Sequence, residues 1–327
     1  MLKHVVASLG ILACVTLNAQ AAERFEITAG SFGGTQYQYS YALSEIVKQY
    51  APQFEILPVE TTGSPASLIK ALQKPQKTVF ATSTTALVDA IQGNQPYSKP
   101  VKNVKLIGFV TQNIQTLITY EDDIKTVQDM SGKRFITTSI MSSSGKHFWN
   151  ILKRAIPGSD KMKPTYANWT AVQNGLLDGT ADVGALGITT CADGPWMPIP
   201  AYAEIVASRG VPHFISVDEK YIREAAKAED MLYIPVLMPK GSLAENVPSS
   251  DIMCWEERLG IGGFSETPDE LAYTIAKLLC EQAEEFSKYT PVGKAMSPSV
   301  TVPSKEFFSD DDIHPGALRY YKEKGLR

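Results

Sequence analysis

The strongest constraint on the fold is a regular alternation along the chain from Phe25 onward. Short β-rich runs are followed by segments of helical period, and clusters of Gly, Ser and Thr separate the two. Such alternation is typical of βαβ units, which place parallel strands in one sheet and helices on its faces. The sequence therefore predicts an α/β fold with polar loops at the carboxyl ends of its strands.

The helical segments are recognised by their apolar spacing and by their first residues. The segment after the first expected strand carries apolar residues three and four positions apart, on one helical face. These residues are Tyr39, Ala42, Leu43, Ile46, Val47 and Tyr50. Ser64 followed by Pro65 predicts the start of the next helix, and the sequence TPDE at 267–270 predicts a late one.

The same α/β pattern occurs twice. After extended runs at 104–110 and 116–120, it restarts with a strand at 134–138. We therefore expect two lobes: residues 22–115 together with 240–327, and residues 116–239. The chain would cross between them near 116–120 and again on its return. In open α/β sheets ligands bind outside the carboxyl ends of strands, so a cleft between the lobes is the expected site.

The first residues have the composition of an export signal. Lys3 and His4 precede an apolar stretch at 5–17, and small residues follow at 19–21. A bilayer-spanning helix needs about 20 apolar residues, so this stretch predicts a signal peptide, residues 1–21, cleaved after Ala21. A lipid anchor on Cys14 is the less favoured alternative, because the apolar run continues past it. We expect a periplasmic protein.

Charge and cysteine content narrow the possible partners. The chain has 31 Lys and Arg against 35 Asp and Glu, without basic blocks, which argues against a nucleic-acid partner. Beyond Cys14, the cysteines Cys191, Cys254 and Cys280 lack metal-ligand spacing, so no metal or cofactor is expected. Buried free thiols are the favoured interpretation, with a Cys254–Cys280 bridge as a weaker alternative.

Enzymatic motifs are missing from the sequence. Beyond residue 21 the histidines are His147, His213 and His314, and neither a GxSxG elbow nor an HExxH motif accompanies them. His147 follows a Ser-Gly loop and is expected to be a solvated helix residue. The sequence therefore predicts no catalytic residues, although a hydrolase that uses a cleft serine remains an alternative.

The loops before the expected helices can bind an anion. A helix start leaves unpaired N–H groups and about half a positive charge, so it favours an anionic oxygen without Lys or Arg. Taken alone, each loop has the composition of an ordinary turn, because Ser, Thr and Gly are common turn and capping residues. Similar loops in both halves, at 33–35, 62–64, 82–83 and 142–145, predict a shared site. Tyr37 could close one side of it, and Trp169 could be either pocket wall or core.

The order of several motifs resembles one family. They are GGTQYQY at 33–39, TGS at 62–64, MSGKRF at 130–135, LLDGTADVG at 176–184 and HPGALRYYKEKG at 314–325. Together they resemble the TRAP-associated extracytoplasmic immunogenic (TAXI) solute-binding proteins. The resemblance implies a two-lobed type II periplasmic-binding-protein fold. It also implies delivery of a small carboxylate (a dicarboxylate, a 2-oxo acid or an acidic amino acid) to a TRAP membrane transporter.

The resemblance also implies ligand-binding positions. With Trp169 added from the helix pattern, the expected ligand-binding residues are Gly33, Gly34, Thr35, Tyr37, Thr62, Gly63, Ser64, Thr82, Ser83, Ser142, Ser144, Gly145, Trp169 and Gly187. The chain departs from the family at Thr84 and Thr85, where many relatives carry an acidic residue, and in the segment GITTCADGPW after Leu186. Both departures alter the expected lining, so the ligand's identity is not transferred.

The function expected from these observations is that of a monomeric receptor without catalysis. Its lobes would close on the ligand about a hinge near 116–120 and a returning strand. Besides the hydrolase, the alternative is a sensor protein that presents its ligand to a signalling receptor.

Overall fold

The computed structural model describes residues 21–191 and 194–327. Residues 1–20 of the predicted signal peptide (1–21) lie outside the described residues. Cys14, the site of the alternative lipid anchor, lies outside them as well. Within the described ranges, none of the helices has the length and apolarity needed to cross a membrane.

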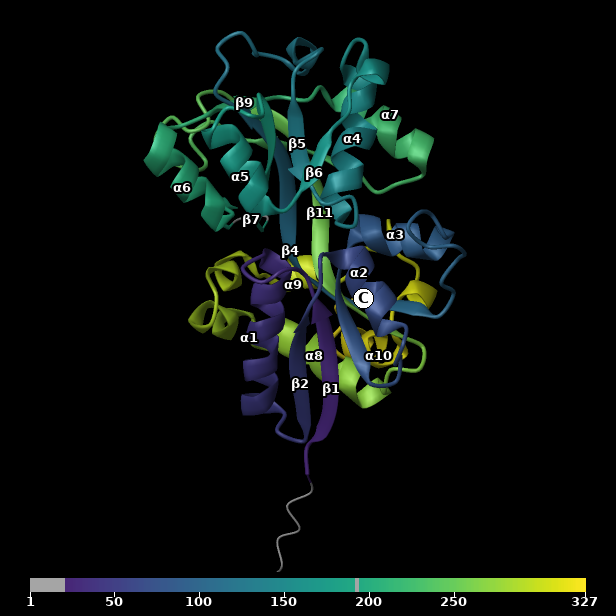
Figure 1. The fold of residues 1–327 in the computed structure, drawn as a ribbon. Helices are drawn as coiled ribbons and strands as arrows, with labels where there is room; N and C mark the ends of the chain where they lie inside the picture. Colours follow the sequence, from purple (N-terminus) through teal and green to yellow (C-terminus); the bar gives the residue numbers. More distant parts are fainter. Residues whose placement is uncertain (1–20, 192–193) are drawn as a thin grey trace, which may run out of the picture.

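Two lobes are joined at a waist by long strands (Figure 1). The described strands form one eleven-stranded sheet, ordered β2-β1-β3-β11-β4-β7-β5-β6 along its main path. In the first lobe β1 pairs in parallel with β2 and β3, as the βαβ pattern predicts. The elements here are β1 (Glu23–Ala29), α1 (Thr35–Tyr50), β2 (Phe54–Glu60), α2 (Ser64–Ala71), β3 (Thr78–Ser83) and α3 (Thr84–Gln92).

The second lobe repeats this arrangement. Its strand β5 pairs in parallel with β6 and β7. The elements are β5 (Phe135–Thr138), α4 (Ser143–Ala155), β6 (Thr165–Ala167), α5 (Trp169–Leu177), β7 (Val183–Thr190), β8 (Met197–Pro198), α6 (Pro200–Arg209), β9 (His213–Ile215), α7 (Glu219–Glu229) and β10 (Ile234–Met238).

Two long strands connect the lobes. The sequence predicts two separate extended runs, at 104–110 and 116–120, whereas the structure has one continuous strand, β4 (Val104–Thr119). The strand is continuous because its polar middle is buried between neighbouring strands. Residues 104–115 of β4 pair with residues 255–264 of β11 (Ile252–Phe264), and residues 112–119 pair with β7. The passage between the lobes thus lies within these strands, while the lobe boundaries after residues 115 and 239 stay a prediction.

Each lobe has its own hydrophobic core. Ile27, Leu43 and Ile275 belong to the first-lobe core, and Phe135 and Val183 to the second. The first lobe is completed by the returning helices α8 (Asp269–Glu281), α9 (Pro298–Thr301) and α10 (Pro315–Glu323). Separate cores allow two lobes to move as bodies about their connections.

Cys254 and Cys280 are both free thiols, so the suggested bridge between them is wrong. Cys254 lies on β11 in a core cluster of the second lobe, whereas Cys280 lies on α8 beside the first-lobe core. Burial raises the pKa of Cys254 to about 12 and that of Cys280 to about 11. The interpretation of Cys254 as a buried, unreactive core thiol agrees with these positions.

Candidate functional site

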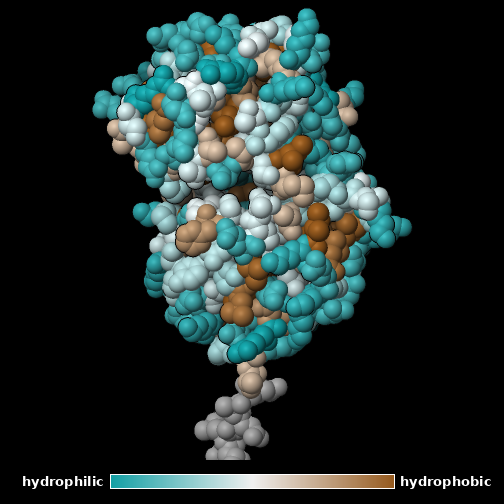
Figure 2. Space-filling view, in the orientation of Figure 1, coloured by the Kyte–Doolittle hydropathy of each residue, from teal (hydrophilic) through white to brown (hydrophobic). Residues whose placement is uncertain are grey.

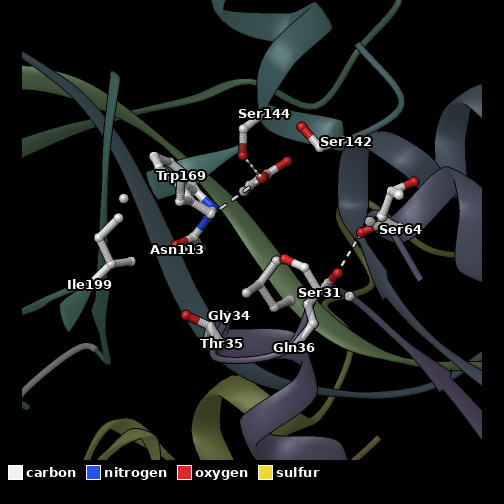
Figure 3. Close-up of a pocket in the computed structure, with 16 residues that line it drawn as sticks. Ser31, Gly34, Thr35, Gln36, Ser64, Asn113, Ser142, Ser144, Trp169 and Ile199 are labelled. Carbon is white, nitrogen blue, oxygen red and sulfur yellow. Dashed lines mark hydrogen bonds between the residues drawn. The ribbon is translucent and has the colours of Figure 1, made fainter. Parts of the chain in front are cut away.

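A hollow lies at the waist between the lobes (Figures 2 and 3). Its volume is about 80 Å³, and one water needs roughly 10–15 Å³ on this measure, so it suits a small metabolite. It is lined by Gly30, Ser31, Gly34, Thr35, Gln36, Thr62, Gly63, Ser64, Asn113, Ser142, Ser144, Trp169, Gly187, Ile199, Glu257 and Leu259.

The first lobe contributes two helix starts without side-chain caps. Gly34 is the N-cap of α1 and Gly63 is that of α2, and neither helix has a side-chain cap bond in the described structure. The N-terminal N–H groups of a helix lack intrahelical partners. A glycine cap also lets a ligand approach closely. Both helix starts can therefore donate to an anionic oxygen in the hollow.

The second lobe contributes two helix starts that carry side-chain caps. Ser142 Oγ accepts a bond of 3.1 Å from Gly145 N at the start of α4. Asn168 Oδ1 accepts one of 2.8 Å from Ala171 N at the start of α5, which brings Trp169 to the wall of the hollow. Each cap already accepts from one N-terminal N–H group of its helix. The first-lobe helices, which have no side-chain cap, therefore offer more N–H groups to a ligand.

The two lobes touch where α2 and α4 begin. Gly63 has a φ of +150°, and a Cβ added there would lie 3.0 Å from Ser142 Cα and 3.2 Å from the carbonyl oxygen of Met141. Real Cβ atoms essentially never lie closer than 3.0 Å to such a neighbouring atom. Only glycine permits this approach without displacing the backbone of the other lobe.

A buried carboxylate, Glu257 on β11, also faces the hollow. Glu257 is only 2% exposed to solvent. Oε2 accepts from Thr85 Oγ1 at 2.7 Å, and Oε1 accepts from Gln115 Nε2 at 3.0 Å and Ser144 Oγ at 3.3 Å. A longer bond of 3.5 Å comes from Asn113 Nδ2. Thr85, a departure from the family pattern, thus helps to hold this carboxylate.

Several of the expected residues come together in the hollow and others do not. Those that line it are Gly34, Thr35, Thr62, Gly63, Ser64, Ser142, Ser144, Trp169 and Gly187. Gly33, Tyr37, Thr82, Ser83 and Gly145 lie outside its lining.

The residues outside the hollow have structural roles. Ser83 caps α3 by accepting from Ala86 N at 3.2 Å, and its neighbour Thr82 is fully buried in β3. The ring of Tyr37 packs against Phe32, with centroids 5.3 Å apart, instead of closing the pocket.

The two glycines outside the lining also have other surroundings. An added Cβ at Gly145 would overlap the carbonyl oxygens of Thr138 and Ser139, so this glycine serves close backbone packing. Gly33 has a φ of +79° and lines an adjoining groove beside Trp169. Its conformation suits a turn.

The lining residues that the sequence interpretation missed are Gly30, Ser31, Gln36, Asn113, Ile199, Glu257 and Leu259. Asn113 and Glu257 lie in the middle of strands. Polar residues gathered within an otherwise apolar strand, such as Gln112, Asn113 and Gln115 or the run 256–258, are the sequence signal that could have identified them. Buried polar groups need partners, so such runs point to a polar network.

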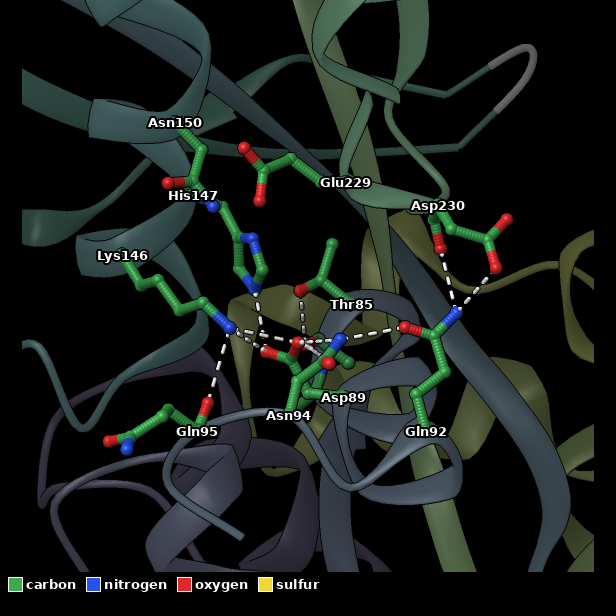
Figure 4. A network of polar contacts seen from close by, with 12 residues as sticks. Thr85, Asp89, Gln92, Asn94, Gln95, Lys146, His147, Asn150, Glu229 and Asp230 are labelled. Atoms are coloured by element: carbon green, nitrogen blue, oxygen red, sulfur yellow. Dashed lines mark hydrogen bonds and ion pairs between the residues drawn. The ribbon is translucent and has the colours of Figure 1, made fainter. Parts of the chain in front are cut away.

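A second polar network bridges the lobes beside the hollow (Figure 4). Lys146 Nζ donates to both oxygens of Asp89 at 2.9 Å, and His147 Nε2 lies 3.2 Å from Asp89. Asp89 follows β3 on α3, whereas Lys146 and His147 belong to α4. Gln92 Nε2 adds bonds of 2.9 Å to Asp230, the C-cap residue of α7.

His147 is therefore not the solvated residue that the sequence suggested. It is 2% exposed and also contacts the hydroxyl of Tyr233. Burial alone would raise the pKa of the Asp89 carboxyl. The hydrogen bonds and charges of His147 and Lys146 outweigh burial and hold that pKa below its usual value. Asp89 on α3 thus makes an electrostatic contact with Lys146 and His147 on α4.

The site has no grouping that suggests a resident metal. Among the described residues, no three His, Cys, Asp or Glu side chains are arranged to hold an ion. Donors from backbone and hydroxyl groups dominate the lining, with one carboxylate. Such a set can bind and orient a small polar molecule.

Two hinged α/β lobes around a polar cleft define the class of periplasmic-binding-protein folds, and solved structures agree. Periplasmic binding protein BugD has a TM-score of 0.53 at 11% identity, covering 93% of this chain and 98% of that one. A protein of Bordetella bronchiseptica has a TM-score of 0.53 at 11% identity, covering 92% and 98%. MatC of Rhodopseudomonas palustris with bound malate has a TM-score of 0.51 at 11% identity, covering 93% and 96%.

The family is shown by the sequence match. Residues 27–325 match the NMT1-like family, and the chain belongs to it. No curated protein matches the chain.

Proposed function

We propose that the protein is a periplasmic receptor that captures a small carboxylate and delivers it, chemically unchanged, to a TRAP-type membrane transporter. The observation that carries this proposal is the convergence of four helix starts, two from each lobe, on one small hollow. Amide dipoles at helix starts favour an anionic oxygen. The proposal includes export with a cleaved signal peptide and action as a monomer.

Two likenesses support the ligand class and the partner. The motif order resembles that of the TAXI solute-binding proteins, which serve TRAP transporters. A protein of the same fold, MatC, has been solved with malate, a small dicarboxylate. We therefore include dicarboxylates, 2-oxo acids and acidic amino acids among the expected ligands.

Capture would work by closure of the lobes. The ligand must contact both lobes, because only differential affinity for the closed state shifts the equilibrium. Thr35 belongs to the first lobe and Ser144 to the second, and both line the hollow. Shifting a 1:99 equilibrium to 99:1 needs about 5.5 kcal/mol, a magnitude that several enclosed hydrogen bonds can supply. Closure would also create the surface that the transporter reads.

A thermal-shift screen of small organic acids against the purified protein tests the proposal, because a ligand stabilises the folded state by mass action. We expect at least one carboxylate to raise the melting temperature and to bind with one-to-one stoichiometry, without turnover. Absence of binding across the screen would contradict the proposed function.

The site itself is tested by removing one hydroxyl from each lobe. Thr35→Ala combined with Ser144→Ala is expected to lower the affinity for that carboxylate at least tenfold, about 1.4 kcal/mol, by titration calorimetry. Ser249→Ala is the control, since Ser249 is exposed and lies outside the hollow. Unchanged affinity in the double variant would place the site elsewhere.

A further inference from the structure

A groove adjoins the hollow and is lined by residues of both lobes. Its volume is about 490 Å³, against about 80 Å³ for the hollow. The two spaces share four lining residues, which are Ser31, Gly34, Trp169 and Ile199. A ligand that is longer than the hollow would therefore extend past these residues into the groove.

The second lobe gives the groove an apolar wall. A Cβ added at Gly187 would lie 3.5 Å from Ile199 Cγ2 and 3.6 Å from Trp169 Cη2, so both side chains pack beside this glycine. Figure 3 shows Trp169 and Ile199 on the same side of the hollow. At the start of α6, Pro200 and Ala201 also line the groove. The second lobe thus offers four apolar side chains to a ligand that leaves the hollow on this side.

The first lobe contributes an exposed phenyl ring. Phe32 lines the groove and is 77% exposed, the highest fraction among the large hydrophobic residues that the structure describes as exposed. Its loop is fixed by two bonds: Gly34 N donates to the carbonyl oxygen of Ser31 at 3.0 Å, and Phe32 N donates to Glu60 Oε1 at 2.8 Å. The Tyr37 ring packs edge-on against the Phe32 ring. A single exposed apolar side chain needs no explanation by itself, but this one is held beside the candidate site.

The polar side chains of the groove do not favour a second carboxylate. Glu204 Oε2 accepts from Gln173 Nε2 at 2.5 Å, Asn168 caps α5, and Glu60 holds the loop of Phe32. None of the described residues that line the groove is Lys, Arg or His, whereas Glu60 and Glu204 are acidic. A carboxylate that entered the groove would meet like charges and no cation. An apolar group would instead leave water for contact with apolar side chains, which is favourable.

We infer that the ligand is a carboxylate with an apolar tail, and that the tail lies in the groove against Phe32 and Trp169 while the carboxylate lies in the hollow. The inference rests on the proposed function and narrows its ligand class. Monocarboxylates and 2-oxo acids with an aliphatic or aromatic tail are favoured over dicarboxylates and acidic amino acids. Because Phe32 and Trp169 belong to different lobes, contact of the tail with both adds to the affinity for the closed state.

Isosteric acids provide the test. In 5-methylhexanoate an isopropyl group replaces the second carboxylate of glutarate, and 5-methyl-2-oxohexanoate is related to 2-oxoglutarate in the same way. In titration calorimetry of the purified protein, we expect at least one branched acid to bind at least tenfold more tightly than its counterpart, about 1.4 kcal/mol. We also expect 3-phenylpropionate to bind at least tenfold more tightly than propionate, because its ring reaches the groove.

Phe32→Ala tests the assigned residue. The substitution removes the exposed ring but leaves the hollow intact, since Phe32 does not line it. We expect the variant to bind 3-phenylpropionate at least fivefold more weakly and propionate with unchanged affinity, whereas a general disturbance of the site would weaken both. Tyr41→Ala is the control. It removes an aromatic side chain that is 46% exposed on α1 and lies outside the hollow and the groove, so both affinities should stay as in the wild type.

The outcomes separate this inference from the function on which it rests. Equal or tighter binding of glutarate and 2-oxoglutarate than of their branched isosteres would overturn the inference while leaving a carboxylate receptor. An unaltered affinity of Phe32→Ala for 3-phenylpropionate would overturn the role of Phe32. If none of these six acids binds, the inference fails, and the proposed function fails with it only if the wider screen of organic acids also finds no ligand.

Discussion

His314, in the string most specific to the family resemblance, supports a helix and not the cleft. It is fully buried at the start of α10, where Nδ1 accepts from Gly316 N at 3.2 Å and Nε2 lies 3.0 Å from the carbonyl oxygen of Thr267. The arrangement fits a neutral imidazole that donates through Nε2. Burial lowers the pKa of His314, although Asp269 acts in the opposite direction. This residue of the C-terminal string thus has a structural role.

The titration of His314 predicts a pH dependence of stability. Because its folded-state pKa lies below the ordinary value of about 6.5, the unfolded chain binds a proton first as the pH falls. The stabilisation is complete above about pH 6.5 and is lost as the pH falls through the folded-state pKa. Urea unfolding at several pH values should show this loss. His314→Asn, which can still cap α10, should flatten the profile below pH 6.5, and an equally steep profile would contradict the assignment.

At the scale of elements, the site is made by helices that begin where strands end. Helices α1 and α2 have glycine at the N-cap and leave donors for a ligand, whereas α4 and α5 are capped by the side chains of Ser142 and Asn168. The alternation of strands and helices predicted these starts. Their mutual approach depends on Gly63, where an added Cβ would lie in unusually tight contact with the start of α4.

Gly63→Ala is expected to hold the starts of α2 and α4 apart. The added methyl group would press on the backbone of the other lobe, so we expect ligand affinity to fall more than tenfold by calorimetry. The positive φ adds a strain cost of about 1–3 kcal/mol to folding. Gly132→Ala is a control for a positive φ without the tight contact, since Gly132 has a φ of +75° with no atom within 4 Å of an added Cβ. It should lose stability but keep its affinity. A Gly63→Ala protein that binds normally would refute the contact's role.

For the whole molecule, the electrostatic bridge between α3 and α4 bears on lobe closure. Asp89 is nearly inaccessible, and it accepts from Lys146 and pairs with His147 on a helix that also lines the hollow through Ser144. Opening the lobes would separate these groups and expose them. A hydrogen bond to a charged group contributes roughly 1.5–3 kcal/mol, so this bridge favours the closed arrangement.

Asp89→Asn is expected to shift the molecule toward an open state. Without the charge, the ligand-free variant should have a larger radius of gyration by small-angle X-ray scattering than the wild type. Its ligand affinity should be about tenfold weaker, since the ligand must then provide more of the closure energy. Asp123→Asn removes a pair with Lys133 that stays within one lobe and serves as the control. An unchanged radius and affinity for Asp89→Asn would show that the bridge does not govern closure.

The sequence by itself determined the α/β architecture, the two-fold repetition and most of the helix starts, because spacing, capping residues and turn residues act over a few positions. It identified Thr35, Gly63, Ser142 and Ser144 among the lining residues for the same reason. It could not separate these from Ser83, which caps α3 as Ser142 caps α4 but does not line the hollow.

Only the tertiary structure decided which polar groups meet. Glu257 is far in sequence from Thr85 and Ser144, and His147 is far from Tyr233, yet each pair is in contact. Such contacts depend on strand order and on how closely two lobes approach, and local propensity carries no information about either. The place of Glu257 in the lining of the hollow comes from this long-range packing.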